Sequence, residues 1–160
     1  MKPDTHVQTK YLVYGLLLLA VMLLTACGTK IIRGASPMVR MTELSHADNK
    51  IALQLSMRNL NGVALDVLAI DFSLSVDGKN IIVYQGPVDT SIAANGTETW
   101  PMEVEESQSS RELLDRLQNG DVKSLPYALE GTITGKEDGD LSFEYEGHIY
   151  PLPGRPGHFR

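Results

Sequence analysis

The chain has 160 residues, with 14 Lys and Arg, 20 Asp and Glu, a formal net charge of −6 and a single cysteine. This length allows one domain of ordinary size, since domains average about 150 residues. The net charge is acidic and the chain has no long basic run, so it lacks the clustered Lys and Arg of a nucleic-acid binder. A single cysteine excludes an internal disulfide and a cysteine-rich zinc site.

An uncharged segment opens the chain. Residues 11–26 contain no charged side chain, and Lys2 and Lys10 precede the apolar run 16–24. A basic start followed by an apolar stretch shorter than the roughly 20 residues of a spanning helix is typical of a secretory signal. The alternative is an uncleaved single-span anchor.

Residues 24–27, with the sequence Leu-Thr-Ala-Cys, resemble the lipobox of bacterial lipoproteins. The resemblance implies cleavage between Ala26 and Cys27 and lipidation of Cys27, whose acyl chains, palmitate among them, hold the protein on a membrane. Gly28 stands where lipoproteins kept in the inner membrane often carry Asp. We therefore expect a lipid-anchored protein on the periplasmic face of the bacterial outer membrane.

Four regions follow from this interpretation: a lipoprotein signal peptide (1–26), a lipidated N-terminus and tether (27–37), a β-sandwich domain (38–152) and a flexible tail rich in Pro and Gly (153–160). Cleavage leaves 134 residues with a net charge of −7. Anionic headgroups should repel such a domain, so the acyl chains must hold it at the membrane.

An alternation of apolar and polar residues begins near residue 51 and predicts antiparallel strands with one buried face. Asp77-Gly78 and Asn95-Gly96 predict type I′ hairpin turns. About seven short strands separated by turns indicate an antiparallel fibronectin- or immunoglobulin-like β-sandwich. The residues expected to face inward are Ile51, Leu53, Leu55 and Met57, then Leu68, Ile70, Phe72, Leu74 and Val76, then Trp100, Met102 and Val104, then Tyr127, Leu129, Gly131 and Ile133, and finally Leu141, Phe143, Tyr145 and Ile149.

A single crossover helix is predicted between the strands. Ser109 and Glu112 have the spacing of a capping box, three leucines between 113 and 117 form a narrow apolar stripe, and Asn119-Gly120 is a stop signal.

Residues 58–62, with the sequence Arg-Asn-Leu-Asn-Gly, resemble the late embryogenesis abundant (LEA) type 2 family, also called the WHy (water stress and hypersensitive response) domain, in which an Asn-Pro-Asn ends one strand. Leu60 takes the place of the proline. The resemblance continues over residues 38–150. It implies a fibronectin-like sandwich with one helix, a protective role in stress, and a structural loop at Asn59, Asn61 and Gly62; the alternative for the two asparagines is ligand binding.

Three polar groups are candidates for chemistry. Glu144, Glu146 and His148 share the outward face of one predicted strand, but residues two apart lie nearly 7 Å from each other, so a solvated face is the better interpretation than a metal site. The acidic turn at 138–140 lacks the order of a calcium loop. Glu103, Glu105 and Glu106 are expected to keep an edge strand soluble.

His46 and His148 are the ordered candidates for a catalytic base, and no nucleophile motif accompanies either of them. We therefore expect no enzymatic activity, no cofactor and no metal. By the family resemblance, the protein protects against desiccation or other envelope stress, with the membrane and client proteins as partners. The alternatives are an adaptor that binds another envelope protein and, less favoured, a carrier of lipid or a small ligand between the sheets.

Overall fold

The computed structural model describes residues 32–160, which form two four-stranded antiparallel sheets and one helix. The strand order is β5-β2-β1-β8 in sheet A and β4-β3-β6-β7 in sheet B. The elements are β1 (Met38–Ala47), β2 (Lys50–Arg58), β3 (Leu65–Val76), β4 (Lys79–Ile92), β5 (Thr97–Glu105), α2 (Gln108–Gln118), β6 (Leu125–Gly135), β7 (Gly139–Ile149) and β8 (His158–Phe159).

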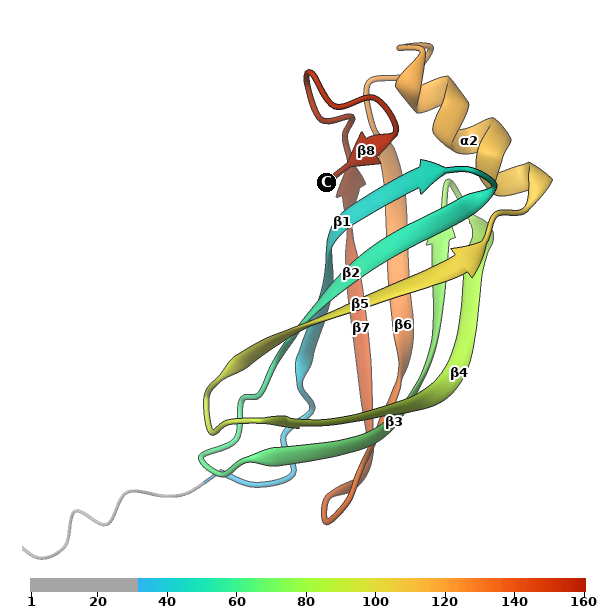
Figure 1. The fold of residues 1–160 in the computed structure, drawn as a ribbon. Coiled ribbons are helices and arrows are strands. Elements are labelled where there is room, and N and C mark those ends of the chain that lie inside the picture. Colours follow the sequence, from blue (N-terminus) through green and yellow to red (C-terminus); the bar gives the residue numbers. More distant parts are fainter. Residues whose placement is uncertain (1–31) are drawn as a thin grey trace, which may run out of the picture. The chain divides into compact units, whose positions relative to one another are not determined.

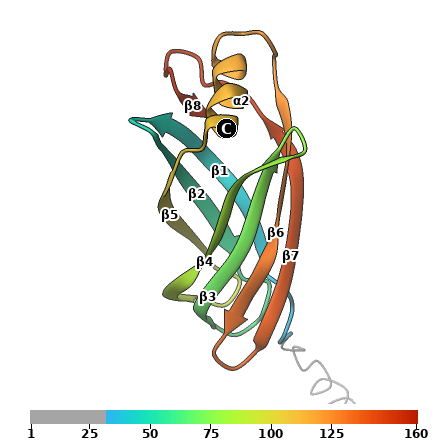
Figure 2. The same ribbon diagram turned by 90° about the vertical axis from the view of Figure 1, so that its right-hand side faces the viewer.

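The two sheets face each other, and the connections gather at two ends (Figures 1 and 2). One end carries α2, β8 and the β3–β4 turn, and we call it the helix end. At the opposite end, β1 begins and the loops 59–64 and 93–96 and the β6–β7 hairpin lie (Figure 1). This architecture confirms the predicted β-sandwich with one crossover helix, since α2 joins β5 of sheet A to β6 of sheet B.

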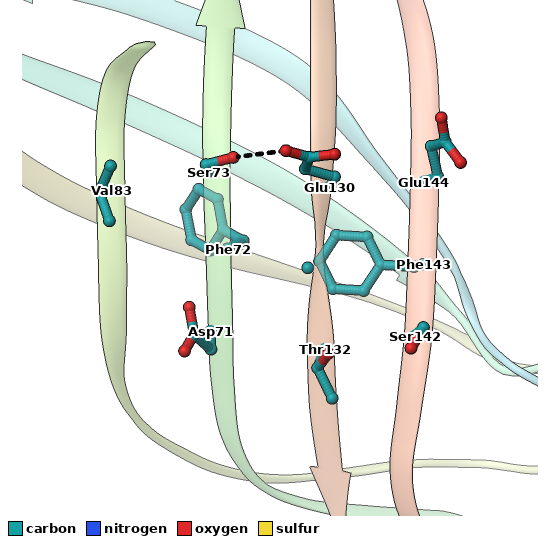
Figure 3. Close-up of a pocket in the computed structure, with 10 residues that line it drawn as sticks. Asp71, Phe72, Ser73, Val83, Glu130, Thr132, Ser142, Phe143 and Glu144 are labelled. Carbon is teal, nitrogen blue, oxygen red and sulfur yellow. Dashed lines mark hydrogen bonds between the residues drawn. The ribbon is translucent and has the colours of Figure 1, made fainter.

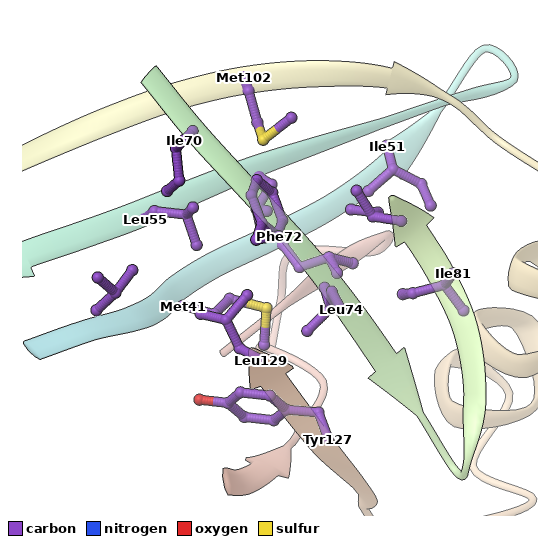
Figure 4. Packing of buried hydrophobic residues seen from close by; sticks show 14 of the residues in the cluster. Met41, Ile51, Leu55, Ile70, Phe72, Leu74, Ile81, Met102, Tyr127 and Leu129 are labelled. Carbon is purple, nitrogen blue, oxygen red and sulfur yellow. The ribbon is translucent and has the colours of Figure 1, made fainter. Parts of the chain in front are cut away.

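The core fills the space between the sheets. Met41 and Leu55 of sheet A lie opposite Phe72, Leu74 and Leu129 of sheet B (Figure 4). All five are less than 9% exposed, and complete burial of one such side chain contributes roughly 1.5–3 kcal/mol. The alternation in β2, β6 and β7 therefore places its apolar residues inward as predicted.

A bulge in β3 overturns one predicted inward position. The register of β3 shifts between Val67 and Ala69 against both neighbouring strands. Because the extra residue reverses the alternation, Leu65 and Val67 face the core and Leu68 is 44% exposed. The prediction that Leu68 faces inward is therefore wrong.

The two turn signals lead to different connections. Asp77 and Gly78 both have positive φ, 52° and 73°, and join β3 to its neighbour β4 in the predicted hairpin. Asn95 also has positive φ, 56°, and Gly96 N–H donates to the carbonyl of Ala93 at 2.8 Å. This second turn carries the chain from sheet B to sheet A, so it is not a hairpin.

The start of α2 differs from the predicted capping box. Ser107 is the N-cap, and its Oγ accepts the backbone N–H of Ser110 at 3.1 Å. Glu112 instead accepts a hydrogen bond from the Gln108 side chain at 3.1 Å. The predicted stop is confirmed, because the helix ends at Gln118 and Gly120 has a φ of +78°.

The C-terminal residues are part of the sandwich. Phe159 has no exposed surface and pairs with Leu44, so β8 covers the edge of β1. Glu43 Oε1 lies 2.9 Å from His158 Nδ1 and 3.3 Å from Arg155 Nη2. These contacts correct the expectation of a flexible tail over 153–160, since Pro and Gly shape a turn that returns Phe159 to the core.

Candidate functional site

Two buried asparagines form a hydrogen-bonded lock at the end of the sandwich away from α2. Asn59 follows the last residue of β2, and Asn61 lies two residues later in the loop to β3. Their exposures are 0% and 1%. A buried amide without hydrogen-bond partners would destabilise the fold, so each polar atom of these two side chains needs a partner.

Asn59 ties three segments together. Its Nδ2 donates to the carbonyls of Val63 at 2.7 Å and of Ile92 and Ala93 at 3.1 Å each. Its backbone N–H donates to the carbonyl of Gly96 at 2.9 Å. The amide thus joins the end of β2 to the turn between the two sheets.

Asn61 binds the segment that leads into β1. Its Nδ2 donates to the carbonyl of Ala35 at 3.0 Å, and its Oδ1 accepts the N–H of Ala35 at 2.8 Å. Gly62 N–H adds a bond to the carbonyl of Ile32 at 3.0 Å. We call Asn59, Asn61 and Gly62 with residues 32–35 the lock, and this end of the sandwich the lock end.

The lock changes the expected domain boundary. Residues 27–37 were expected to be a tether, but Ala35 is held by two hydrogen bonds and Pro37 is buried. The domain therefore includes residues 32–37, and Ala26, Cys27 and Gly28 lie outside the described residues. Both asparagine side chains bond within the domain, which is the geometry of a structural loop.

The outer face of sheet B is acidic throughout. Seven exposed carboxylates point outward from its four strands, and β3, β6 and β7 contain no Lys or Arg. Several of these carboxylates accept hydrogen bonds from hydroxyl groups: Ser73 donates to Glu130 at 3.3 Å and Thr134 donates to Asp140 at 2.9 Å. The seven residues are Asp66, Asp71, Asp89, Glu130, Asp140, Glu144 and Glu146.

An open hollow of about 660 Å³ lies in the middle of this face (Figure 3). Asp71, Glu130 and Glu144 stand around it, and the small side chains of Ser73 and Ser142 leave it shallow. Among the described residues, no group of three or more His, Cys, Asp or Glu side chains has the geometry to hold a metal ion. Glu144, Glu146 and His148 accordingly lie along an exposed strand face without converging.

At the helix end, the buried side chain of Glu106 forms ion-pair contacts that the sequence did not predict. The side chain of Glu106 is 3% exposed, and its two oxygens lie 3.1 Å from His46 Nδ1 and 2.9 Å from Arg111 Nε. Arg111 also donates to Oδ1 of Asn49 at 2.6 Å. Glu106 therefore fastens the β1–β2 turn to the start of α2, which corrects its expected role in keeping an edge strand soluble.

The other residues considered for chemistry have ordinary surroundings. Glu103 and Glu105 are exposed on the edge strand β5, where Glu103 pairs with Lys50 at 3.2 Å. His46 is engaged with Glu106, and His148 is exposed on β7. No sequence signal distinguishes Glu106 from its two acidic neighbours, because its partners lie in other segments.

The described titratable groups include one with a clearly altered pKa. Burial raises the pKa of Tyr127 to about 12, repulsion from Tyr145 adds to this, and Arg40 opposes it. Tyr127 belongs to the core and lies beside Tyr145, with ring centroids 6.1 Å apart. Its shift is therefore a consequence of packing.

Among residues 32–160, no helix has both the length and the apolar character that crossing a membrane requires. The comparison with curated proteins gives no match.

Solved structures resemble the sandwich at low sequence identity. The solution structure of AT1g01470 from Arabidopsis thaliana has a TM-score of 0.55 at 16% identity, over 83% of this chain and 91% of that one. A protein from Archaeoglobus fulgidus gives a TM-score of 0.42 at 17% identity, over 71% and 95% of the two chains. A candidate LEA protein, At2g46140.1, gives 0.46 at 14% identity, over 98% and 94%.

The model of the family LEA_2, described as late embryogenesis abundant protein, matches residues 54–146. The match covers more than half of the chain and extends from β2 to β7, including the lock asparagines and the acidic face. The AT1g01470 structure shares the fold. The chain therefore belongs to the late embryogenesis abundant family LEA_2.

Proposed function

We propose that this protein is a lipid-anchored, non-enzymatic LEA type 2 domain of the WHy kind, held on the periplasmic face of the bacterial outer membrane, where it protects envelope proteins during desiccation or related stress. Family membership supports a stress-related domain. The anchor and the compartment rest on the lipobox resemblance of residues 24–27.

The acidic outer face of sheet B carries this proposal. Its carboxylates face solvent without basic side chains on β3, β6 or β7, so they bind water and repel other acidic surfaces. A protein coated by such a domain is kept from contact with its neighbours as water is lost. This action requires charge and hydration and no covalent step.

The use of the buried polar groups supports a non-enzymatic role. Every buried side-chain nitrogen or oxygen in the described part has a hydrogen-bond partner within the domain. Asn59, Asn61 and Glu106 are all engaged in holding segments together. None of these groups is left to act on a substrate.

The interior gives the carrier alternative little support. Residues facing between the sheets, such as Phe72, Leu55 and Leu129, are 0–1% exposed. The hollow of about 660 Å³ lies on the outer face of sheet B, not between the sheets. A buried lipid would need an enclosed apolar space of roughly 300 Å³ or more.

The protective role is tested by drying a labile enzyme with and without the purified domain. We expect the wild-type domain to preserve activity and the variant Asp71→Asn/Glu130→Gln/Glu144→Gln to lose much of this effect. The matched control neutralises three exposed acids elsewhere, Glu98→Gln/Glu103→Gln/Glu105→Gln. Equal protection by all three proteins, or none by the wild type, would contradict the proposal.

The anchor is tested separately by growing cells with radiolabelled palmitate. The wild-type chain should incorporate the label and fractionate with the outer membrane, and Cys27→Ser should abolish incorporation. Label that persists in Cys27→Ser would show that Cys27 is not the acylated residue.

A further inference from the structure

The position of the first described residues limits where the domain can lie. Ile32 and Ala35 are hydrogen-bonded to the lock at one end of the sandwich. Four residues, 28–31, separate Ile32 from Cys27, so five residue steps join the two. At about 3.5 Å per step, five steps reach at most about 18 Å. A lipidated Cys27 therefore keeps the lock end within this distance of the bilayer surface.

Exposed apolar side chains gather at the same end. Six large hydrophobic residues of the described part are exposed, and four of them belong to the lock end: Ile32 (54%), Met38 (45%), Leu60 (38%) and Leu68 (44%). Ile32 and Leu60 belong to the lock segments, Met38 opens β1 opposite Arg58, and Leu68 is the bulge residue near the start of β3. These side chains surround the lock end, with Met38 on sheet A and Leu68 on sheet B, so apolar surface faces outward around this end.

The lock end carries charges of both signs. Arg33, Arg58 and Lys136 lie here beside Asp66, Asp89, Glu137 and Asp138. Basic side chains with long apolar stems can reach lipid phosphates while the apolar residues enter the headgroup region. The carboxylates in the middle of the outer face of sheet B, Asp71, Glu130 and Glu144, would be repelled by anionic lipids.

We propose that the lock end, with Ile32, Met38, Leu60 and Leu68, is the surface of the domain that lies against the lipid bilayer. The inference rests on the proposed lipidation of Cys27. The sandwich then stands end-on, with α2 and β8 directed away from the membrane and the acidic face of sheet B open to client proteins (Figure 1).

The test places a single dye at chosen positions of the full-length lipidated chain. Acylated Cys27 has no free thiol, so Leu60→Cys and Ile32→Cys can each be labelled with an environment-sensitive fluorophore. The controls are Val83→Cys, 72% exposed on the outer face of sheet B, and Tyr150→Cys, 49% exposed at the helix end. Each labelled protein is reconstituted in phosphatidylethanolamine and phosphatidylcholine vesicles that contain a nitroxide-labelled lipid.

We expect blue-shifted emission and severalfold stronger quenching at positions 60 and 32 than at 83, with the weakest quenching at 150. Equal quenching at all four positions, or stronger quenching at 83 or 150, would overturn the end-on orientation. Flotation of the vesicles separates the two proposals. If the chain floats with the vesicles but quenching is equal at all four positions, the anchor is supported and the docking surface is contradicted. If the chain does not float and its Cys27 reacts with the dye, both proposals are contradicted.

Discussion

Asn61 donates two hydrogen bonds to Oδ1 of Asn59, one from its backbone N–H at 2.9 Å and one from its side-chain Nδ2 at 3.0 Å. This contact orients Asn61 toward Ala35, while Asn59 Nδ2 points to the carbonyls at the end of β4. The two amides therefore act as one unit that joins the loop after β2, the turn between the sheets and the segment before β1.

Asn59→Ala should lower the free energy of unfolding by roughly 3 kcal/mol, because the carbonyls of Val63, Ile92 and Ala93 and the Asn61 N–H each lose a hydrogen bond to this buried side chain. Urea denaturation measures the change. The matched control is Asn80→Ala on the exposed start of β4, for which we expect a change within about 0.5 kcal/mol. A similar small change for both variants would show that the lock contributes little stability.

Asn61→Ala should release residues 32–35 with less effect on the rest of the sandwich, because its two side-chain bonds to Ala35 are lost. Trypsin should then cleave after Arg33 about tenfold faster, since a protease acts on locally opened backbone. Mass spectrometry of the early digest identifies the site. Unchanged cleavage after Arg33, relative to Asn80→Ala, would mean that other contacts hold this segment.

Gly131→Ala should destabilise the fold by more than about 2 kcal/mol, since the added Cβ would overlap the Asp71 carbonyl oxygen and lie 2.7 Å from Phe72 Cβ. Gly135→Ala, in the same strand, is the control, because its nearest atoms would be 3.4 Å away. Thermal unfolding of both variants compares them. A larger loss for Gly135→Ala would be inconsistent with this packing.

Phe159→Ala should cost about 3–4 kcal/mol, because Phe159 is completely buried against β1 and lies near His46, with ring centroids 5.7 Å apart. Tyr150→Ala removes a comparable ring that is 49% exposed and should cost much less. Chemical denaturation gives both values. If both variants are equally mild, the C-terminal residues do not belong to the cooperative unit.

Tyr127 makes stability fall at high pH. Its pKa is raised to about 12 in the folded protein, mainly by burial, and is near 10 in the unfolded chain. Between these values the unfolded chain loses the proton and the folded one keeps it, so stability is fully present below pH 10 and declines toward pH 12, by at most about 1.4 kcal/mol per unit. Urea unfolding at several pH values should show a shallower decline for Tyr127→Phe than for the wild type.

Much of the fold followed from local chemistry. Alternation with a period of two identified the inward faces of β2, β6 and β7, and positive φ at Asp77 and Gly78 matched the hairpin expected of that dipeptide. Such patterns reflect the pleat of a strand and the steric limits of a turn, which depend on neighbouring residues.

The candidate site was visible only in part. The sequence Asn-Leu-Asn-Gly drew attention to Asn59 and Asn61, but their partners Ala35, Ile92 and Ala93 lie 26 to 34 residues away. Glu106 could not be separated from Glu103 and Glu105, since its burial depends on His46 and Arg111.

The sequence by itself determined the strands β2 to β7, the β3–β4 turn and the helix and, through the acids of β3, β6 and β7, which contain no Lys or Arg, the charge of most of one sheet face. The tertiary structure decided what depends on distant contacts: the bulge that turns Leu68 outward, the passage of the Asn95 turn between sheets, and the return of Phe159 to the core. Local sterics and periodicity are encoded over a few residues, whereas strand pairing and burial are settled by which apolar faces can cover one another.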